Sequence, residues 1–206
     1  MMVAEFPPGV LARTFGCAAL SDSGEDVSTS SDALAMGRLA HGEIDALGEL
    51  YDRHQAAIRR FATRMTGSSD EGDDLVHATF LAALRTAGAF DGRRSCRAWL
   101  LGITAQLIRR QRSTFARWAR LLGGFRHAEP SSLRDPEGAL SAREGIERGL
   151  ARLSDEKRSV LLMAEVEGLS GDEIAQALAI PVGTVWTRLH YARRELLALL
   201  SEEPRP

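Results

Sequence analysis

The sequence is poor in cysteine, in lysine and in long apolar runs. The scarcity of cysteine and of apolar runs each excludes a class of protein. Its 206 residues include two cysteines, Cys17 and Cys96, too few for a disulfide framework or a four-ligand metal site. We therefore expect a reducing, cytoplasmic location and no metal or cofactor. No stretch approaches the roughly 18 uninterrupted apolar residues of a membrane helix, so we expect no membrane insertion. The 44% hydrophobic and 26% charged residues are those of an ordinary globular protein.

Lysine is nearly absent, and the arginines are concentrated in one tract. Lys157 is the single lysine among 26 basic residues, and 28 acidic residues bring the formal net charge to −2. This sum argues weakly against nucleic acid as a partner, but binding depends on how charge is distributed. Nine arginines and no acidic residue lie between Arg93 and Ala128, which leaves 17 basic against 28 acidic residues elsewhere. The chain is an acidic protein with one basic tract.

Helical periodicity runs along most of the chain, and no segment alternates with period two for long enough to form a sheet. The sequence therefore predicts an all-α fold of two small helical domains joined by a flexible linker, which begins with a helical extension through Leu122. The predicted segments are a disordered acidic tail at 1–31, a helical domain at 32–112, the linker at 113–138, a helix-turn-helix domain at 139–200 and a short tail at 201–206.

Several short stretches predict where helices end. Residues 66–70 (TGSSD) stop one helix and cap the next. Ser170 and Glu173 form a capping box, and Pro181 suits the first position of a new helix after a tight turn. The helix that follows carries apolar residues three and four apart, which predicts one buried stripe. The stripe consists of Val182, Val185, Leu189, Ala192, Leu196 and Leu199. A short helix, a turn and a longer helix is the helix-turn-helix pattern.

The face of this last helix opposite the stripe has an unusual composition. It presents Trp186, Thr187, His190, Tyr191 and Arg194. Two aromatic residues among hydrogen-bonding side chains suit the major groove of DNA, where Thr and Arg reach base edges and phosphates. A solvated face of a helical bundle, or a surface for another protein, is the alternative interpretation.

Three C-terminal stretches resemble the promoter-recognising domain of bacterial extracytoplasmic-function (ECF) sigma factors: 153–162 (LSDEKRSVLL), 167–175 (EGLSGDEIA) and 182–193 (VGTVWTRLHYAR). The N-terminal half is similar to the other domain of that family, on residues 50–54 (LYDRH), 72–80 (GDDLVHATF) and 98–100 (AWL). The resemblance runs from about 34 to 200 in the order of the family. It implies a sigma-70 family protein that binds core RNA polymerase, directs it to promoter DNA and helps to open the duplex.

The resemblance also implies where each partner binds. In the family, the helix that matches residues 73–81 docks on the clamp helices of the largest polymerase subunit, which assigns polymerase binding to Asp73, Asp74, Val76, His77 and Phe80. Val76 and Phe80 are equally explained as core residues. Asp73 and Asp74 are equally explained as acidic residues that complement the helix dipole.

The loop 87–97 and the helix 95–112 match the family's segment for minus-ten recognition and melting. The expected DNA-binding residues there are Arg93, Arg94, Arg97, Gln106, Arg109 and Arg110. A pocket beside the glycine-bearing loop is expected to hold a base turned out of its stack. In the helix for minus-thirty-five recognition they are Thr184, Trp186, Thr187, Arg188, His190, Tyr191 and Arg194.

This sequence departs from the family at several of these positions. Asn is usual at the position of Gln106, Asp at that of Arg110, an aromatic residue at that of Cys96, and Lys or Arg at those of Trp186 and Tyr191. Fewer permanent cations in the recognition helix should weaken phosphate anchoring.

Two alternatives remain open at this stage: a stand-alone helix-turn-helix regulator, and a sigma-like protein that acts mainly through protein contacts. A regulator would explain residues 140–200 but not 34–112. The five histidines are scattered and no catalytic motif is present, so we expect no enzyme. The family implies an anti-sigma factor as a further partner.

Overall fold

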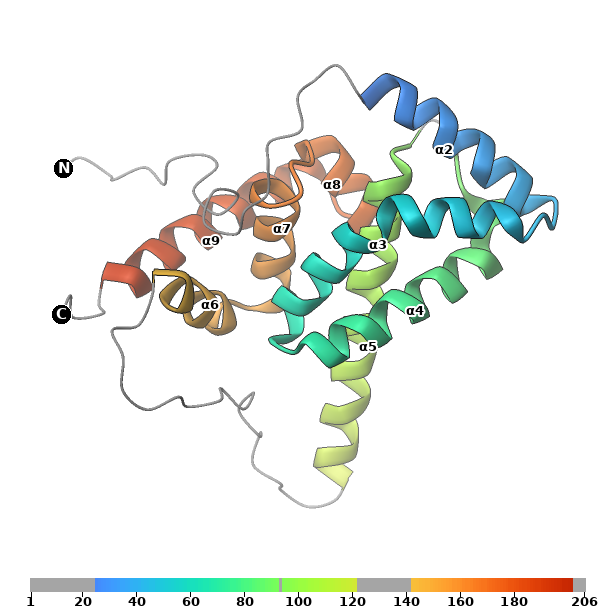
Figure 1. Ribbon diagram of the computed structural model, residues 1–206. Coiled ribbons are helices and arrows are strands. Elements are labelled where there is room, and N and C mark those ends of the chain that lie inside the picture. The colour runs from blue at the N-terminus through green and yellow to red at the C-terminus, as the bar shows by residue number, and fades with distance from the viewer. Residues whose placement is uncertain (1–24, 93, 122–141, 202–206) are drawn as a thin grey trace.

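The computed structural model describes residues 25–92, 94–121 and 142–201, and their side chains within 31–92, 94–117 and 144–201. In these segments the chain forms helices and no strands (Figure 1), so the predicted all-α fold is confirmed. None of the described helices is both long and apolar enough to cross a membrane. The elements are α2 (Glu25–Ala40), α3 (Asp45–Thr66), α4 (Ser69–Thr86), the 3-10 turn η1 (Ala87–Ala89), α5 (Cys96–Leu121), α6 (Ala142–Arg152), α7 (Asp155–Glu165), α8 (Gly171–Leu178) and α9 (Val182–Ser201).

Local side-chain chemistry explains where these helices begin and end. Gly67 closes α3 in the left-handed region at φ 81°, and the Ser68 hydroxyl accepts a hydrogen bond from the Glu71 amide at the start of α4. Ser95 does the same for Ala98 at the start of α5. The capping box of Ser170 is complete at the start of α8. Each stop and cap predicted at 66–70 and at Ser170 is confirmed.

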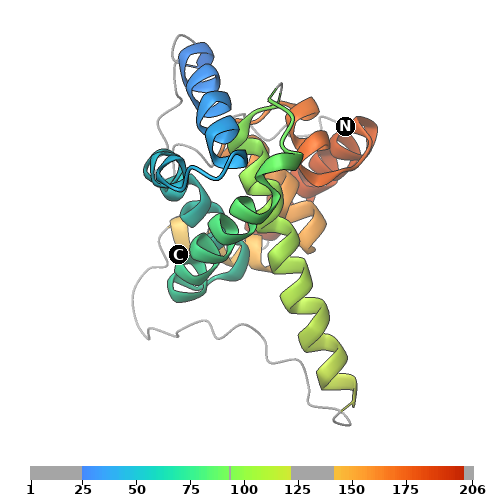
Figure 2. The same cartoon turned by 90° about the vertical axis from the view of Figure 1, so that its right-hand side faces the viewer.

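Helix α2 begins at Glu25, inside the predicted acidic tail, so the disorder expected for 25–31 is corrected to helix. A residue added to an existing helix forms one more backbone hydrogen bond and does not have to be buried. Polar residues can therefore extend the start of a helix, where apolar periodicity does not reveal them. Residues 1–24, 122–138 and 202–206 of the predicted tails and linker lie outside the described residues. Helix α5 runs to Leu121, in agreement with the expected extension, and its end projects from the body (Figure 2).

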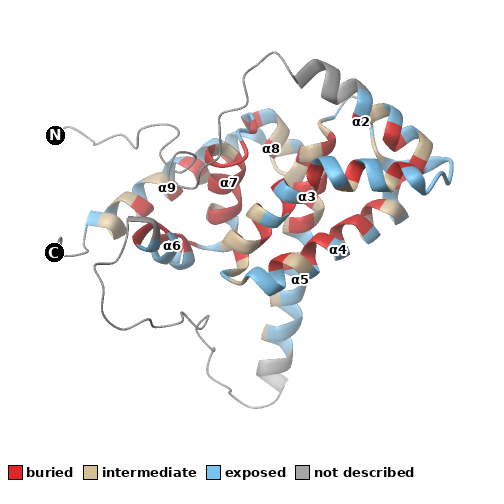
Figure 3. Ribbon diagram, in the orientation of Figure 1, coloured by how far each residue is buried: buried red, intermediate tan, exposed pale blue. Residues whose placement is uncertain are grey.

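The buried side chains form two clusters, and the buried positions along the helices are coloured red in Figure 3. One fills the space among α2, α3, α4 and the start of α5, with Met36, Leu50 and Ile58 at its centre. The other is shared by the two halves of the chain. It joins Phe61, Met65, Leu75, Leu101 and Ile108 from the first half to Leu150, Leu161, Ile174, Val185, Leu189 and Leu196 from the second. The two helical groups therefore share a continuous apolar core.

The predicted stripe on α9 is confirmed in its middle and wrong at its beginning. Val185, Leu189, Ala192 and Leu196 are buried, whereas Val182 is exposed and Leu199 is half-buried. Val182 is the first residue of the helix.

Candidate nucleic-acid and polymerase surfaces

Helices α8 and α9 form a helix-turn-helix whose turn is Ala179–Pro181. Ala179 adopts the left-handed conformation at φ 53°, which redirects the chain within three residues. The face of α9 opposite the core is exposed, with Trp186 and Tyr191 at 55% and 47% exposure. Thr187, His190 and Arg194 are exposed on the same face, as predicted.

Close contacts hold the aromatic side chains of this face in place. The Trp186 ring lies against the backbone of Gly171, where a Cβ atom would come within 2.5 Å of Cζ2. The Arg194 guanidinium lies 5.6 Å from the centre of the Tyr191 ring, a cation–π geometry. The Thr187 hydroxyl donates to the Gly183 carbonyl at 2.8 Å. Thr184 and Arg188, also predicted to bind DNA, are half-buried.

The predicted polymerase-binding residues on α4 fall into two groups that differ in burial. Asp74 and His77 are exposed, and Asp73 forms an ion pair with Arg59 at 2.6 Å. Val76 and Phe80 are buried in the first core cluster. The prediction of direct contact from these two is therefore corrected, because their spacing places them on the apolar face of α4. They hold the helix in place.

The predicted minus-ten residues also differ in their surroundings. Arg94, Gln106, Arg109 and Arg110 are exposed, and Arg94 lies 3.9 Å from Asp91. Arg93 lies outside the described residues. Arg97 is half-buried and forms an ion pair with Glu167, 70 residues further along the chain. Part of the basic tract is therefore neutralised within the molecule.

Glu167 is the acidic centre of the contact between the two halves. Its side chain is 0% exposed and accepts hydrogen bonds from Arg60, at 2.9 and 3.3 Å, and from Arg97. Such charge-assisted, bidentate bonds offset much of the cost of burying a carboxylate. The arginines come from α3 and α5, whereas Glu167 follows α7.

A second set of polar contacts lies along the same interface. Arg112 pairs with Asp155 and donates to the Met65 carbonyl at 2.7 Å. Arg158 donates to the same carbonyl at 2.8 Å. Burial, together with the charge of Arg112, lowers the pKa of Arg158 to about 10. The end of α3 is therefore tied to both α5 and α7.

Helices α5 and α8 approach most closely at Gly102. A Cβ atom at this position would come within 2.3 Å of the Ala177 carbonyl oxygen. Only glycine allows the two helices to lie at this separation. Next to this crossing is a shallow pocket, lined by Arg94, Ser95, Ala98, Trp99, Glu173, Gln176 and Ala177. Helix α8 forms one wall of this pocket.

Glu167, Arg60 and Gly102 were not identified from the sequence as interface residues. A signal was present for Glu167, because this acid lies between the apolar residues Val166 and Leu169, and a buried carboxylate needs a charged or hydrogen-bonding partner. The partners of Glu167 could not be predicted from the sequence, because Arg60 and Arg97 are 107 and 70 residues away along the chain.

Comparison with known proteins agrees with this geometry. The family model described as Sigma-70 region 2 matches residues 50–129, and that described as Sigma-70, region 4 matches residues 143–196. ECF RNA polymerase sigma factor SigL of Mycobacterium tuberculosis is 34% identical over 166 residues, which cover 79% of this chain and 93% of SigL.

Two solved structures are similar to the whole fold. CnrH, in complex with the cytosolic domain of CnrY, is 28% identical with a TM-score of 0.62, covering 84% of this chain and 99% of CnrH. RpoE of Bartonella quintana, in complex with the anti-sigma factor NepR, is 23% identical with a TM-score of 0.63, covering 76% and 98%; at this identity the likeness shows the fold alone.

A helical protein with both sigma regions and an exposed helix-turn-helix face is a transcription initiation factor. The chain belongs to the ECF subfamily of the sigma-70 family. It is a promoter-specific RNA polymerase sigma factor, and the alternative of a stand-alone helix-turn-helix regulator is not favoured, because region 2 is present on the same chain.

Proposed function

We propose that this sigma factor reads the minus-thirty-five element with the exposed face of α9. The observation that carries this proposal is the exposure of Trp186 and Tyr191 on a helix whose opposite face is buried. The rings supply apolar contact to thymine methyl groups, and Thr187 and Arg194 supply hydrogen bonds and charge. With Arg194 over the Tyr191 ring, the face combines a guanidinium group with two exposed aromatic rings.

The proposed minus-ten surface is the loop before α5 together with the middle of that helix. Arg94 of the loop and Arg109 and Arg110 of the helix are exposed, and exposed guanidinium groups neutralise phosphates and stack on unpaired bases. Gln106 lies on the same helix and offers an amide to a base edge. The polymerase supplies the chemistry of transcription, and we expect no catalytic activity of the sigma factor itself. It acts in the bacterial cytoplasm, where the chromosome and the polymerase are found.

The proposed polymerase contact on α4 consists of Asp73, Asp74 and His77. A suitable test compares His77→Ala with His41→Ala. Both histidines are exposed and each places Nδ1 near the carbonyl four residues earlier, at 3.0 and 2.8 Å. His77→Ala should weaken binding to core polymerase, and His41→Ala should leave it unchanged. Equal affinities for the two variants would contradict the assignment.

The compact arrangement is the proposed polymerase-free form. In this arrangement Glu167 neutralises Arg97, and α8 forms a wall of the pocket at the start of α5. We expect binding to a promoter to separate the two halves. An anti-sigma factor that holds the closed form is the expected regulator, and the complex of CnrH with the cytosolic domain of CnrY is a precedent for a protein partner on this fold.

Run-off transcription with core polymerase tests the function as a whole. We expect start-site-specific transcripts from promoters of its own genome when this protein and core polymerase are the only proteins present. A requirement for another sigma factor would instead indicate a regulator. Binding to core without duplex opening would indicate a protein that acts through protein contacts.

A further inference from the structure

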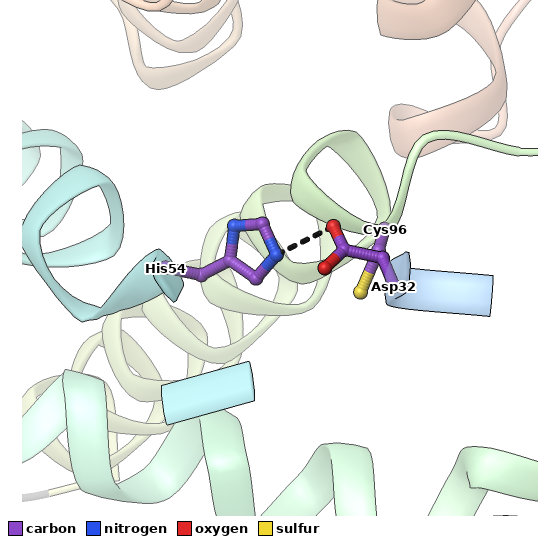
Figure 4. A group of neighbouring side chains, drawn as sticks. All are labelled: Asp32, His54 and Cys96. Carbon is purple, nitrogen blue, oxygen red and sulfur yellow. Dashed lines mark hydrogen bonds and ion pairs between the residues drawn. The ribbon is translucent and has the colours of Figure 1, made fainter. Parts of the chain in front are cut away.

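Three side chains, from α2, α3 and α5, meet in the interior of the first half of the chain. Asp32 of α2, His54 of α3 and Cys96 of α5 are 4%, 6% and 2% exposed. Their oxygen, nitrogen and sulfur atoms all lie within 4.8 Å of one another. Figure 4 shows the His54 ring and the Cys96 sulfur on the two sides of the Asp32 carboxylate. A carboxylate, an imidazole and a thiol at one point is the donor set of a transition-metal site.

From this geometry we propose that Asp32, His54 and Cys96 bind a divalent metal ion of the Zn²⁺ type, with water as the fourth ligand. Within the described residues, no further His, Cys, Asp or Glu belongs to the group. Three protein ligands and one water are a common tetrahedral arrangement for zinc. Sulfur and nitrogen ligands favour zinc over magnesium or calcium, which prefer oxygen.

The distances fit an ion after small side-chain rotations. Zinc bonds of about 2.0–2.1 Å to nitrogen and oxygen and about 2.3 Å to sulfur place tetrahedral ligand atoms about 3.3–3.6 Å apart. His54 Nε2 and Asp32 Oδ2 are 2.8 Å apart and joined by a hydrogen bond, so they must separate by about 0.5 Å. The widest gap to the sulfur, at most 4.8 Å, must close by at most about 1.3 Å.

The surroundings also suit a metal ligand set. Arg53 donates to Oδ1 of Asp32 and leaves Oδ2 directed at His54. A hydrogen bond to the second carboxylate oxygen orients the ligand, as outer-shell partners do in known zinc sites. Binding of the ion would replace the proton of the Cys96 thiol, which passes to solvent as the sulfur–metal bond forms.

The site would connect α2 to the domain that binds polymerase and DNA. Asp32 lies outside the matched region 2, whereas His54 and Cys96 lie inside it. No metal was expected from the sequence, because two cysteines are too few for a four-ligand site. The three proposed ligands are 22 and 42 residues apart along the chain and form no motif. Their meeting point is a product of the tertiary fold.

Metal binding can be measured with Co²⁺ as a spectroscopic probe. Full-length protein is freed of metal with a chelator, kept reduced with a phosphine and titrated with Co²⁺, followed by displacement with Zn²⁺. We expect one ion per chain, a thiolate-to-cobalt charge-transfer band and a higher midpoint of thermal unfolding with Zn²⁺. Absence of the band in the unmutated protein would overturn the proposal, since only a hydrogen-bonded cluster would then be present.

Matched variants locate the ion. Cys17→Ser should retain the band, because it leaves Cys96 in place. Cys96→Ala should remove the band and weaken Zn²⁺ affinity by more than about 100-fold, which exceeds the loss for an outer-shell partner. Asp32→Asn, which preserves shape, should weaken affinity even where Cys96→Ala does not fold by circular dichroism. Loss of the band in Cys17→Ser, or unchanged affinity in Asp32→Asn, would refute the assignment.

Discussion

Gly102→Ala should shift the molecule toward an open form in which α5 and α8 no longer lie in close contact. The new Cβ would lie 2.3 Å from the Ala177 carbonyl oxygen, more than 1 Å inside ordinary contact. Because that oxygen belongs to the backbone of α8, it cannot move aside as a flexible side chain would. Overpacking of this kind costs about 1–3 kcal/mol, which corresponds to a roughly 5- to 150-fold shift toward the open form.

The gain in helix propensity does not offset this shift. Replacing Gly by Ala in a helix stabilises it by about 1 kcal/mol, but α5 is helical in the closed and the open forms alike. Gly48→Ala in α3 is the matched control, since a Cβ there meets nothing within 4 Å. It should raise the stability of the fold and leave the distance between the two halves unchanged.

Small-angle scattering measures the separation directly. The radius of gyration of Gly102→Ala should exceed that of the unmutated protein and of Gly48→Ala. Binding of single-stranded minus-ten DNA should increase in parallel, because the wall that α8 forms beside Trp99 is removed. An unchanged radius of gyration for Gly102→Ala, in a folded protein, would refute the argument that this crossing closes the molecule.

Three further predictions test the interface and the recognition helix. Glu167→Gln should free two arginines and steepen the dependence of single-stranded DNA affinity on salt by about 0.7 logarithmic units per arginine, measured by fluorescence anisotropy; an unchanged slope would oppose it. Gly171→Ala should displace the indole of Trp186, shift its emission and weaken promoter binding; unaltered emission would show that the contact is absent. Leu189→Ala should lower the free energy of unfolding by about 2–5 kcal/mol, measured by urea titration. Thr187→Ala should change that free energy by less than about 0.5 kcal/mol but should reduce promoter binding, measured in a binding assay.

The helices and their ends were predictable because their determinants are local. The stop at Gly67, the cap at Ser68 and the box of Ser170 with Glu173 each depend on residues within four positions. The buried middle of α9 follows from spacing alone, and so does the exposure of Trp186 and Tyr191 on its other face. Local chemistry of this kind is encoded in any short window of sequence.

Sequence patterns were less decisive where a residue had two possible roles. The family resemblance assigned Val76 and Phe80 to the polymerase, and a core position explained them equally well; the structure places both in the core. Likewise, Arg97 lies in an acid-free tract along the sequence, yet its nearest acid in space is Glu167. Charge along the chain therefore overstated how much of the tract is available to DNA.

The sequence by itself determined the all-α class, the family and the two faces of the recognition helix, because these follow from periodicity and from motifs within single segments. Only the tertiary structure decided that Glu167 joins Arg60 to Arg97, that Gly102 permits the crossing of α5 and α8, and that Asp32 and His54 meet Cys96. Each of these contacts joins residues tens of positions apart. Such contacts are set by how helices pack, which no local pattern specifies.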